Sequence, residues 1–305
     1  MDALSHFLAL HAVTTTLDWR CELNAPWRLV NEGAAPGILP YHLVTEGEAW
    51  LEMAERETVR LHAGDLLMLP HGSPHVLHAG DVAAPLPDVL PAGATARGTL
   101  KSTGPGRRSE ILCGEFVLDA ATSGLLIRSL PEVVLLKAQD RESQLHQLML
   151  MLKREAREQL PGARIVVQHL ASTLFSLLIR DWLREAALPG NMLRLLAEPR
   201  LHLAVQAMLE SPGRSWTLQA LAARCYMSRA TFVRLFKQVA GQAPGSFLTS
   251  VRLLQAARLL EQPGFSIAAI SEMVGYASEP AFHRMFKQRM GMPPGAFRRR
   301  KEAGG

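Results

Sequence analysis

Three cysteines are the side chains in this sequence best suited to covalent chemistry, and they stand at Cys21, Cys113 and Cys225. They are too few and too scattered for a disulfide framework or a Cys-x-x-Cys metal site. Oxidants attack the thiolate, a form that the cations Arg20 and Arg28 could favour at Cys21. Two thiols in one domain can pass through a sulfenic acid to a disulfide that cellular reductants reset. A cysteine in a strand is more often a small buried hydrophobe, as we predict for Cys225, so both interpretations stay open for Cys21 and Cys113.

Basic residues are concentrated at one end of the chain, which has a net charge of +5 as a whole. Residues 198–305 contain 15 Lys and Arg against 6 Asp and Glu, whereas residues 1–197 contain 18 against 22. A region with a net charge of +9 is expected to bind a polyanion.

An internal repeat lies inside this basic region. The segment 228–247 recurs at 278–297 with ten identical residues in twenty positions, and each copy follows a short helix-like run and a turn. Serine or threonine stands where helix N-caps are expected, and glycine stands where each second helix must end; these residues are Thr217, Ser228, Ser266, Ser278, Gly241 and Gly291. The pattern predicts two helix-turn-helix units, which bind double-stranded DNA by placing the second helix in the major groove.

The second helix of each unit has a basic face opposite its apolar stripe. Because arginine can pair bidentately with guanine, we predict that some of these residues contact base edges. The predicted base-reading residues are Arg229, Arg234, His283 and Arg284. The predicted phosphate-binding residues are Lys237, Lys287, Arg298 and the rest of the basic run to residue 301. A helix over 246–262 would span about 24 Å and could hold the two recognition helices near one DNA turn apart.

The first half of the chain has the pattern of strands. Residues 19–77 alternate apolar and polar side chains in short runs, which is typical of a β-sandwich or barrel. Residues 81–108 lack periodicity and are rich in proline, glycine and alanine, so we predict a mobile loop. Two strands, at 111–118 and 133–136, are expected to close the sheet. Two apolar helices, at 142–159 and 163–185, are expected either to form a homodimer or to pack on the sheet.

The length of 305 residues allows about two domains. We predict an α+β multidomain protein: a β-barrel sensor domain at 1–140, a helical dimerisation segment at 141–190 and an all-α double helix-turn-helix domain at 198–305. No apolar run approaches the roughly 18 residues needed to span a bilayer, and the start of the sequence lacks the features of a signal peptide. We therefore expect a cytoplasmic protein that does not associate with membranes.

The last hundred residues resemble the DNA-binding domain of AraC/XylS-family transcription regulators. The segment GYASEPAFHRMFK at 275–287, followed by GMPPGAFR at 291–298, is similar to the signature of that family. The resemblance implies a sequence-specific regulator that binds promoter DNA and, as an activator, contacts RNA polymerase.

The upstream part resembles the cupin-type sensor domains of the same family. The segment GDLLMLPHGSPH at 64–75 fits the second cupin motif. The start MDALS, together with Cys21 and the Leu112-Cys113-Gly114 strand, is similar to the RclR-type activators that respond to reactive chlorine. This likeness implies that oxidation of Cys21, with Cys113 as a possible partner, switches transcription on.

Neutral imidazoles suit zinc, iron or copper, so the histidines of a cupin-like domain are metal candidates. The first cupin motif should supply a His-x-His pair and a Glu upstream of Gly47, but Gly33-Ala34-Ala35-Pro36 stands there. We therefore predict structural histidines, no metal or other cofactor and no enzymatic activity; the weak metal candidates are His42 and His75. The alternative to oxidant sensing is a small-molecule effector in the cupin cavity, lined by residues such as Trp27, Tyr41 and Trp50.

Overall fold

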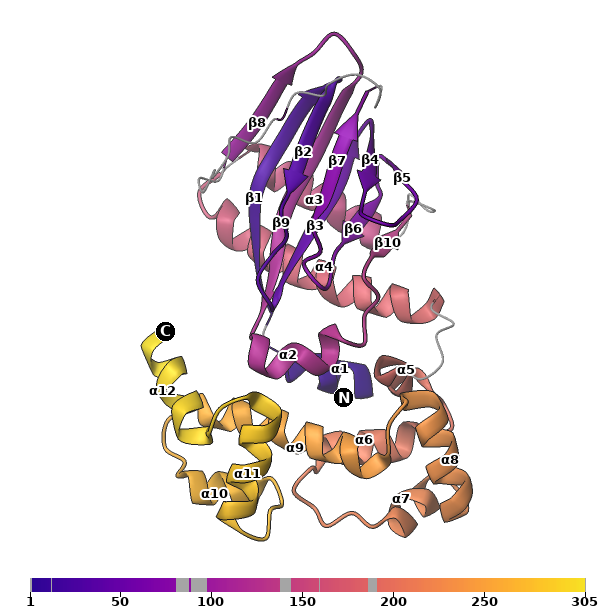
Figure 1. The fold of residues 1–305 in the computed structure, drawn as a ribbon, viewed down its shortest axis with the longest axis vertical. Coiled ribbons are helices and arrows are strands. Elements are labelled where there is room, and N and C mark those ends of the chain that lie inside the picture. The colour runs from indigo at the N-terminus through magenta and orange to yellow at the C-terminus, as the bar shows by residue number, and fades with distance from the viewer. Residues whose placement is uncertain are drawn as a thin grey trace. The chain divides into compact units, whose positions relative to one another are not determined.

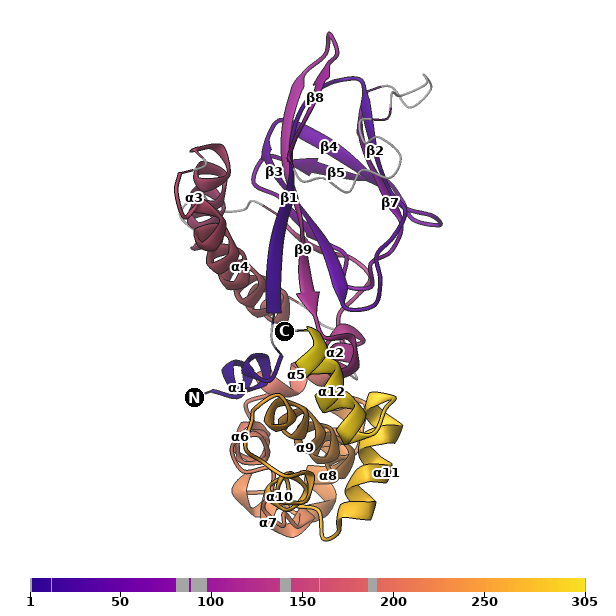
Figure 2. The same ribbon diagram turned by 90° about the vertical axis from the view of Figure 1, so that its left-hand side faces the viewer.

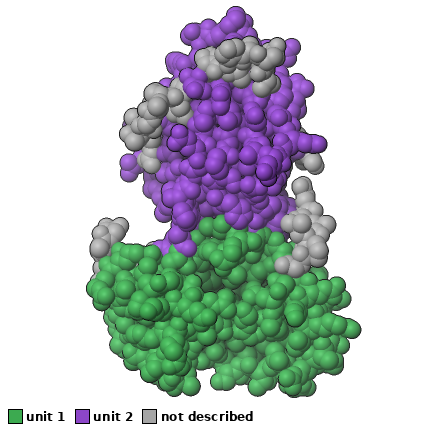
Figure 3. Space-filling view, viewed as in Figure 1, with its two compact units in different colours: residues 1–12, 121–129, 186–305 green, residues 13–120, 130–185 purple. Residues whose placement is uncertain are grey.

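The computed structural model describes residues 2–11, 13–80, 88, 98–137, 144–158, 160–185 and 191–304. The chain divides into two compact units, each drawn from separate stretches of sequence (Figure 3). Residues 13–120 and 130–185 form one of them, which we call the strand unit. Residues 1–12, 121–129 and 186–305 form the other, which we call the helical unit.

Two sheets make up most of the strand unit (Figure 1). The larger sheet has the strand order β10-β6-β3-β9-β1-β8, and the smaller has the order β2-β7-β4-β5. Neighbouring strands pair antiparallel except β1 and β8, which are parallel. The strands are β1 (Val13–Asn24), β2 (Trp27–Asn31), β3 (Ile38–Glu46), β4 (Glu48–Glu52), β5 (Val59–His62), β6 (Leu66–Met68), β7 (His75–Ala79), β8 (Gly98–Thr103), β9 (Arg108–Leu118) and β10 (Val134–Leu136).

Apolar side chains from both sheets meet in one core. Leu23 and Ile111 of the larger sheet belong to the same buried cluster as Trp27, Leu51 and Leu77 of the smaller sheet. Burial of apolar surface, at about 25 cal/mol per Å², holds the two sheets together. The predicted strand-rich N-terminal region is confirmed.

The segment predicted as a mobile loop is only partly described. Residues 98–103, which fall inside it, form strand β8, so the prediction of a loop is wrong for that stretch. β8 pairs with β1 in register, Leu100 opposite Cys21, and this long-range pairing supplies the order that the local composition does not predict. Residues 81–87 and 89–97 lie outside the described residues.

Helices α3 (Gln144–Glu158) and α4 (Ala163–Glu185) pack against each other and against the larger sheet (Figure 2). The ring of Phe175 on α4 lies 5.1 Å from that of Phe116 on β9, and the Thr15 hydroxyl of β1 donates a hydrogen bond to the carbonyl of Gln168 on α4. Packing on the sheet, one of the two expected arrangements, is therefore present. None of the described helices is long and apolar enough to cross a membrane.

The helical unit has caps at the predicted positions of its helix-turn-helix repeat. Thr217, Ser228 and Ser266 each accept a backbone N–H bond at a helix start, whereas Ser278 occupies an N-cap position without that bond. Gly241 and Gly291 end the second helices with φ of 69° and 77°, which glycine adopts readily. The helices are α1 (Ala3–Ala9), α2 (Ala120–Ile127), α5 (Met192–Ala197), α6 (His202–Glu210), α7 (Leu218–Arg224), α8 (Arg229–Ala240), α9 (Pro244–Leu260), α10 (Ile267–Met273), α11 (Glu279–Met290) and α12 (Pro294–Gly304).

Aromatic side chains at equivalent positions of the two repeats form their cores. Phe236 of α8 packs edge-on against Phe247 of α9, and Phe286 of α11 packs in the same way against Phe297 of α12. All four rings are fully buried. The predicted fold class, mixed α+β with a strand-rich N-terminal part and an all-α C-terminal part, is confirmed.

The N-terminal helix α1 belongs to the helical unit rather than to the sheets that follow it in sequence. It contacts α5 and α6, its Phe7 is fully buried, and Arg258 of α9 donates a hydrogen bond to the carbonyl of Ala9. The ring of His11 lies 4.8 Å from that of Phe7 and is also buried.

A buried thiol-histidine site and a candidate DNA-binding face

Cys21 and Cys113 lie side by side in the core of the strand unit. They come from neighbouring strands, β1 and β9, and their Sγ atoms are 3.9 Å apart. The two residues are not directly opposite: Cys21 pairs with Ile111, and Cys113 pairs with Trp19. This diagonal relation places both sulfurs on the same face of the sheet. Both cysteines are free thiols.

His42 stands directly opposite Cys113 in the β3–β9 pairing. Its Nδ1 lies 3.0 Å from the Cys113 Sγ. Burial, together with the neighbouring His75, holds the pKa of His42 well below its ordinary value, so the imidazole is neutral. A neutral imidazole keeps one nitrogen free to accept a proton.

His75 extends the cluster across the interior to the smaller sheet. It begins β7, and its Nε2 lies 2.8 Å from the Nε2 of His42. Its Nδ1 lies 2.9 Å from the carbonyl oxygen of Ser73. Burial lowers the pKa of His75, against a smaller opposing effect of the Ser73 carbonyl. Four side chains from four strands therefore form a continuous chain of contacts: Cys21, Cys113, His42 and His75.

All four of these side chains line a cavity of about 400 Å³. The same cavity is lined by polar residues, namely Asp18, Asn31, Glu32 and Glu115. Trp27, Tyr41 and Trp50, expected to line the cupin cavity, are not among its lining residues. Trp27 and Tyr41 are instead fully buried in the core, and the Tyr41 hydroxyl donates a hydrogen bond to the Thr16 carbonyl.

The two histidines do not form a metal site. A metal needs lone pairs that converge on one point, but His42 and His75 contact each other, and their second nitrogens face Cys113 and Ser73. Within the described residues, no group of three or more His, Cys, Asp or Glu is arranged to hold a metal ion. The donor set that a metal-binding cupin needs therefore does not fit here.

Arginine does not activate Cys21 in the way that the sequence suggested. Arg20 precedes Cys21 on β1, so its side chain points to the opposite face of the sheet, where it contacts Glu22 and Glu110. Arg28 is half exposed and pairs with Asp88. The hydrogen-bond contact with Cys21, together with burial, instead holds the pKa of Cys113 well above its ordinary value. The resting Cys113 is a thiol.

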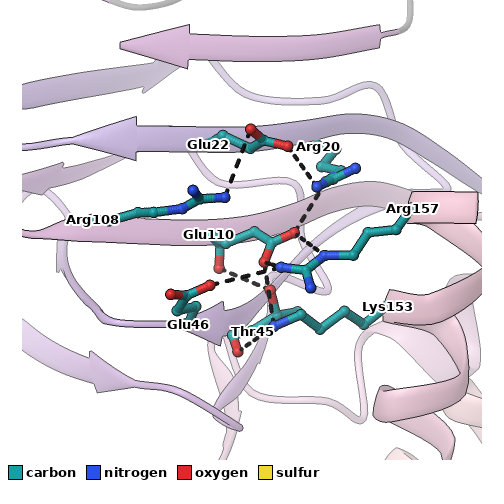
Figure 4. A network of polar contacts seen from close by, with 8 residues as sticks. All are labelled: Arg20, Glu22, Thr45, Glu46, Arg108, Glu110, Lys153 and Arg157. Atoms are coloured by element: carbon teal, nitrogen blue, oxygen red, sulfur yellow. Dashed lines mark hydrogen bonds and ion pairs between the residues drawn. The ribbon is translucent and has the colours of Figure 1, made fainter. Parts of the chain in front are cut away.

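An ion-pair network around the buried Glu110 lies on the face of β1 and β9 opposite to the two cysteines (Figure 4). The Glu110 carboxylate on β9 is fully buried and contacts Arg20 of β1, together with Lys153 and Arg157 of α3. Burial by itself would raise the pKa of Glu110, but the hydrogen bond from Arg157 and the charge of Lys153 outweigh it and lower the pKa to about 2. The network ties α3 to the two strands that carry the cysteines. Sequence reasoning did not find it, since its members are far apart in the chain.

Cys225 lies apart from this site, at the C-terminal end of α7 in the helical unit. It is buried, and burial raises the pKa of its thiol. These surroundings favour an inert thiol.

The predicted DNA-contacting residues are distributed over α8, α11 and α12. Arg229, Arg234 and Lys237 are exposed on α8, where they line a shallow groove together with Leu218, Ala230, Val233 and Gln238. Arg284 and Lys287 are exposed on α11.

Two of the predicted residues have partners inside the protein. The Nε2 of His283 lies 3.3 Å from a carboxylate oxygen of Glu279 on the same helix. Arg298 donates a 2.7 Å hydrogen bond to the carbonyl of Phe265, in the turn before α10. The Arg298 contact is a hydrogen bond, whereas the Nε2 of His283 has no hydrogen-bond partner among the described residues and forms an ion pair with Glu279 only when the imidazole is protonated.

Comparison with known proteins agrees with this architecture. Residues 2–184 match a cupin family model, and residues 221–300 match a helix-turn-helix domain model. The chain belongs to the AraC family of transcription regulators, with an N-terminal cupin domain and a C-terminal helix-turn-helix domain.

Within that family the chain is similar to the RCS-specific HTH-type transcriptional activator RclR of Escherichia coli, at 33% identity over 92% of this chain and 90% of the relative. It is 30% identical to the HTH-type transcriptional regulator MtrA of Neisseria gonorrhoeae over 92% of each chain. The solved DNA-binding domain of AdpA in complex with a target DNA is 34% identical and covers 35% of this chain and 95% of its own, with a TM-score of 0.33.

Proposed function

We propose that this AraC-type regulator is an activator whose cupin domain senses oxidants such as reactive chlorine species through reversible oxidation of Cys21 and Cys113. The observation that carries the proposal is the 3.9 Å separation of the two sulfurs in the wall of a cavity. Closing this separation to about 2.0 Å makes a disulfide. The similarity to an RCS-specific activator supports the choice of oxidant.

Disulfide formation would change the pairing of β1 with β9. Diagonal partners in antiparallel strands have Cα atoms about 7–8 Å apart, whereas disulfides join Cα atoms usually about 4.4–6.8 Å apart. Cys21 and Cys113 are such a diagonal pair, so the bond requires one strand to shift along the other. The register of β1 already shifts between Leu17 and Trp19, next to the partner of Cys113. We infer that this irregularity is where the strands yield.

The Glu110 network offers a route from the cysteines to helix α3. Glu110 precedes Cys113 by three residues on β9 and is held by Lys153 and Arg157 of α3, so a shift of β9 displaces the groups that anchor the helix. α3 also carries two exposed apolar side chains, Leu150 and Met151. We propose that α3 and α4 form the interface of a homodimer, and that oxidation changes how the two copies are joined.

The helix-turn-helix domain would deliver this signal to promoter DNA. We propose that the exposed basic residues of α8 and α11 bind the operator, with Arg229, Arg234 and Arg284 reading base edges and Lys237 and Lys287 contacting phosphates. His283 and Arg298 are further candidates, once DNA competes for the contacts that they make in the free protein. RNA polymerase is the partner expected of the activated form.

The test is in vitro transcription from the DNA upstream of the protein's own gene, with reduced protein, with protein treated with stoichiometric hypochlorous acid, and after added thiol reductant. We expect transcription to rise on oxidation and to return on reduction, and peptide mass spectrometry to find a Cys21–Cys113 cross-link. Cys21→Ser should abolish the response, and the matched control Cys225→Ser should keep it. Unchanged transcription with intact DNA binding would overturn the proposal.

A small-molecule effector is the second candidate, because the cavity of about 400 Å³ is large enough for one. Polar groups in its lining, Asn31, Glu32 and Glu115 among them, could orient such a ligand. This candidate predicts that Cys21→Ser and Cys113→Ser leave activation intact in cells. It also predicts that a compound from a cell extract raises the melting temperature of the reduced protein.

A further inference from the structure

We propose that His42 is the general base for Cys113 and that His75 positions it, so that Cys113 is the thiol that attacks the oxidant and Cys21 is the thiol that closes the disulfide. This inference rests on the proposed function, because it names the chemistry of the same site. It reverses the order suggested by the sequence, which placed the reactive thiol at Cys21.

One backbone carbonyl sets the direction of every hydrogen bond in the cluster. The Ser73 oxygen can only accept, so the Nδ1 of His75 carries a hydrogen and donates it. The Nε2 of neutral His75 is therefore an acceptor, and the Nε2 of His42, 2.8 Å away, must be the donor. Neutral His42 then has its lone pair on Nδ1, the atom that faces Cys113.

It follows that the Cys113 S–H donates to Nδ1 of His42, over 3.0 Å. The Cys21 S–H is left to donate to the sulfur of Cys113. When the Cys113 proton moves to His42, the sulfur keeps a donor on each side, the Cys21 S–H and the new Nδ1–H. The negative charge that develops in the reaction therefore forms at Cys113, where the new Nδ1–H of His42 can stabilise it.

The cluster is neutral at rest, and this suits a base that acts only during reaction. Low imidazole pKa values and a high thiol pKa disfavour a standing thiolate–imidazolium pair. The charged groups that share the cavity are the carboxylates of Asp18, Glu32 and Glu115, and the charge of Asp18 adds to the raised pKa of Cys113. The proton passes from Cys113 to His42 as the sulfur attacks, so the site can react without a standing thiolate.

Access also favours Cys113. It retains 6% of its surface exposed, whereas Cys21 has 0%. Both line the cavity, but only Cys113 touches a histidine among the contacts of the described residues.

The reaction balances with hypochlorous acid as the oxidant. The Cys113 sulfur attacks chlorine, the O–Cl bond breaks, and the hydroxide takes up the proton held by His42, which gives a sulfenyl chloride and water. The Cys21 sulfur then attacks that of Cys113, the S–Cl bond breaks, and chloride and a proton leave. Two thiols have lost two electrons, and chlorine has gained them.

The experiment measures alkylation of single-cysteine full-length proteins by iodoacetamide between pH 6 and 8. Cys21→Ser with Cys225→Ser leaves only Cys113, and we expect its rate to be nearly independent of pH, since neutral His42 is the base throughout. Adding His42→Asn, which can accept a hydrogen bond but not a proton, should lower the rate at pH 7 at least about tenfold. The remaining rate should rise about tenfold per pH unit, as for direct ionisation of the thiol.

Three matched proteins complete the design. His78→Asn removes another buried imidazole of β7, away from the cysteines, and should leave the rate within about twofold. His75→Ala removes the acceptor that fixes the His42 tautomer and should lower the alkylation rate of Cys113. This variant replaces His42→Asn in the experiment if His42→Asn does not fold. The protein with Cys21 as its single cysteine should not respond to His42→Asn.

The proposed role of His42 would be overturned if the alkylation rate of Cys113 and its pH profile were the same with and without His42. It would also be overturned if His42→Asn slowed the alkylation of Cys21 and Cys113 equally. The same measurement separates this inference from the proposed function. If hypochlorous acid links Cys21 to Cys113 and activates transcription, but His42→Asn does not change the alkylation rate of Cys113, only the proposed role of His42 as general base fails. If alkylation depends on His42 but no disulfide forms in the wild-type protein, the sensing function fails instead.

Discussion

Arg157 of α3 reaches the fully buried Glu110 of β9, with its Nε 3.0 Å from the Glu110 Oε1. We predict that Glu110→Gln lowers the free energy of unfolding at pH 7 by about 2 kcal/mol, because the partly exposed cations around it lose their charged hydrogen-bond acceptor. The lowered pKa of Glu110 adds a pH dependence: its contribution is complete above the unfolded carboxyl pKa of about 4.3 and is lost as pH falls toward 2.

Urea unfolding of wild type and Glu110→Gln at pH 7 and pH 3 measures both effects. The difference between the two proteins should shrink at pH 3. Glu48→Gln is the control, since Glu48 forms a more exposed ion pair with Arg60. A difference that stays constant with pH would show that Glu110 does not titrate as its surroundings indicate.

The two kinds of basic residue on the recognition helices should respond differently to mutation. Arg234→Ala is predicted to lose about 1–3 kcal/mol of preference for the operator over random DNA, because the proposed partners of the Arg234 guanidinium are base edges. Lys287→Ala should weaken both DNAs alike and reduce the slope of log affinity against log salt by about 1. Fluorescence anisotropy at several salt concentrations measures this. Arg200→Ala is the control, because Arg200 lies outside α8 and α11 and pairs with Glu198.

Oxidation should loosen one specific pair of strands. After stoichiometric hypochlorous acid, amide hydrogens near Cys21 and Cys113 are predicted to exchange at least about tenfold faster, because the disulfide pulls a diagonal pair out of register. The β4–β5 pair, which shares no strand with the cysteines, should keep its protection. Hydrogen exchange with mass spectrometry checks this, and unchanged protection despite a complete Cys21–Cys113 bond would contradict the proposed shift.

Placing a charged side chain on α3 or α4 should disrupt the proposed dimer interface. Met151 of α3 and Ile165 of α4 are 53% and 52% exposed, which is costly for side chains of this size if nothing covers them. Met151→Lys or Ile165→Lys should shift the protein from dimer to monomer in sedimentation velocity, with unchanged circular dichroism. Leu203→Lys on α6 places the same charge on another exposed apolar position and should leave the dimer intact.

His11 should make the docking of α1 sensitive to acid. Burial lowers its pKa to about 4, and neither ring nitrogen has a hydrogen-bond partner among the described residues. Its stabilising contribution is therefore complete above the unfolded pKa of about 6.5 and is lost as pH falls toward 4. His11→Leu should remove this pH dependence. Melting temperatures at pH 7 and pH 5 measure it, and an equal loss on acidification in both proteins would exclude His11 as the cause.

Local chemistry was enough to predict the helix-turn-helix repeat. Caps such as Ser228 and αL glycines such as Gly241 act within a few residues, and the sequence shows them directly. The recurrence of the same pattern at Gly291 made the prediction secure. The strand-rich character of residues 19–77 was predicted for the same reason, since alternation is local.

The geometry of the site could not be predicted in that way. The residues leave a Cys21–Cys113 pair as one of two interpretations, which the resemblance favours. The contact between His42 and Cys113 depends on strand register across 71 residues. The histidines were expected to be structural or, more weakly, metal ligands. Only the fold shows that their nitrogens face a thiol, a carbonyl and each other. The position of Arg20 shows the converse: a neighbour in sequence points away from Cys21 because side chains alternate along a strand.

The assignment of α1 to the helical unit has a consequence for synthesis. α1 ends at Ala9 and is made first, but its partners α5 and α6 begin only at Met192 and His202. At about 5–20 residues per second, the ribosome takes roughly ten to forty seconds to supply them. During that time the Phe7 side chain has no native surface to cover it. The helical unit is therefore assembled from segments that lie far apart in the sequence, and a nascent chain cannot complete it before residues 186–305 have been made.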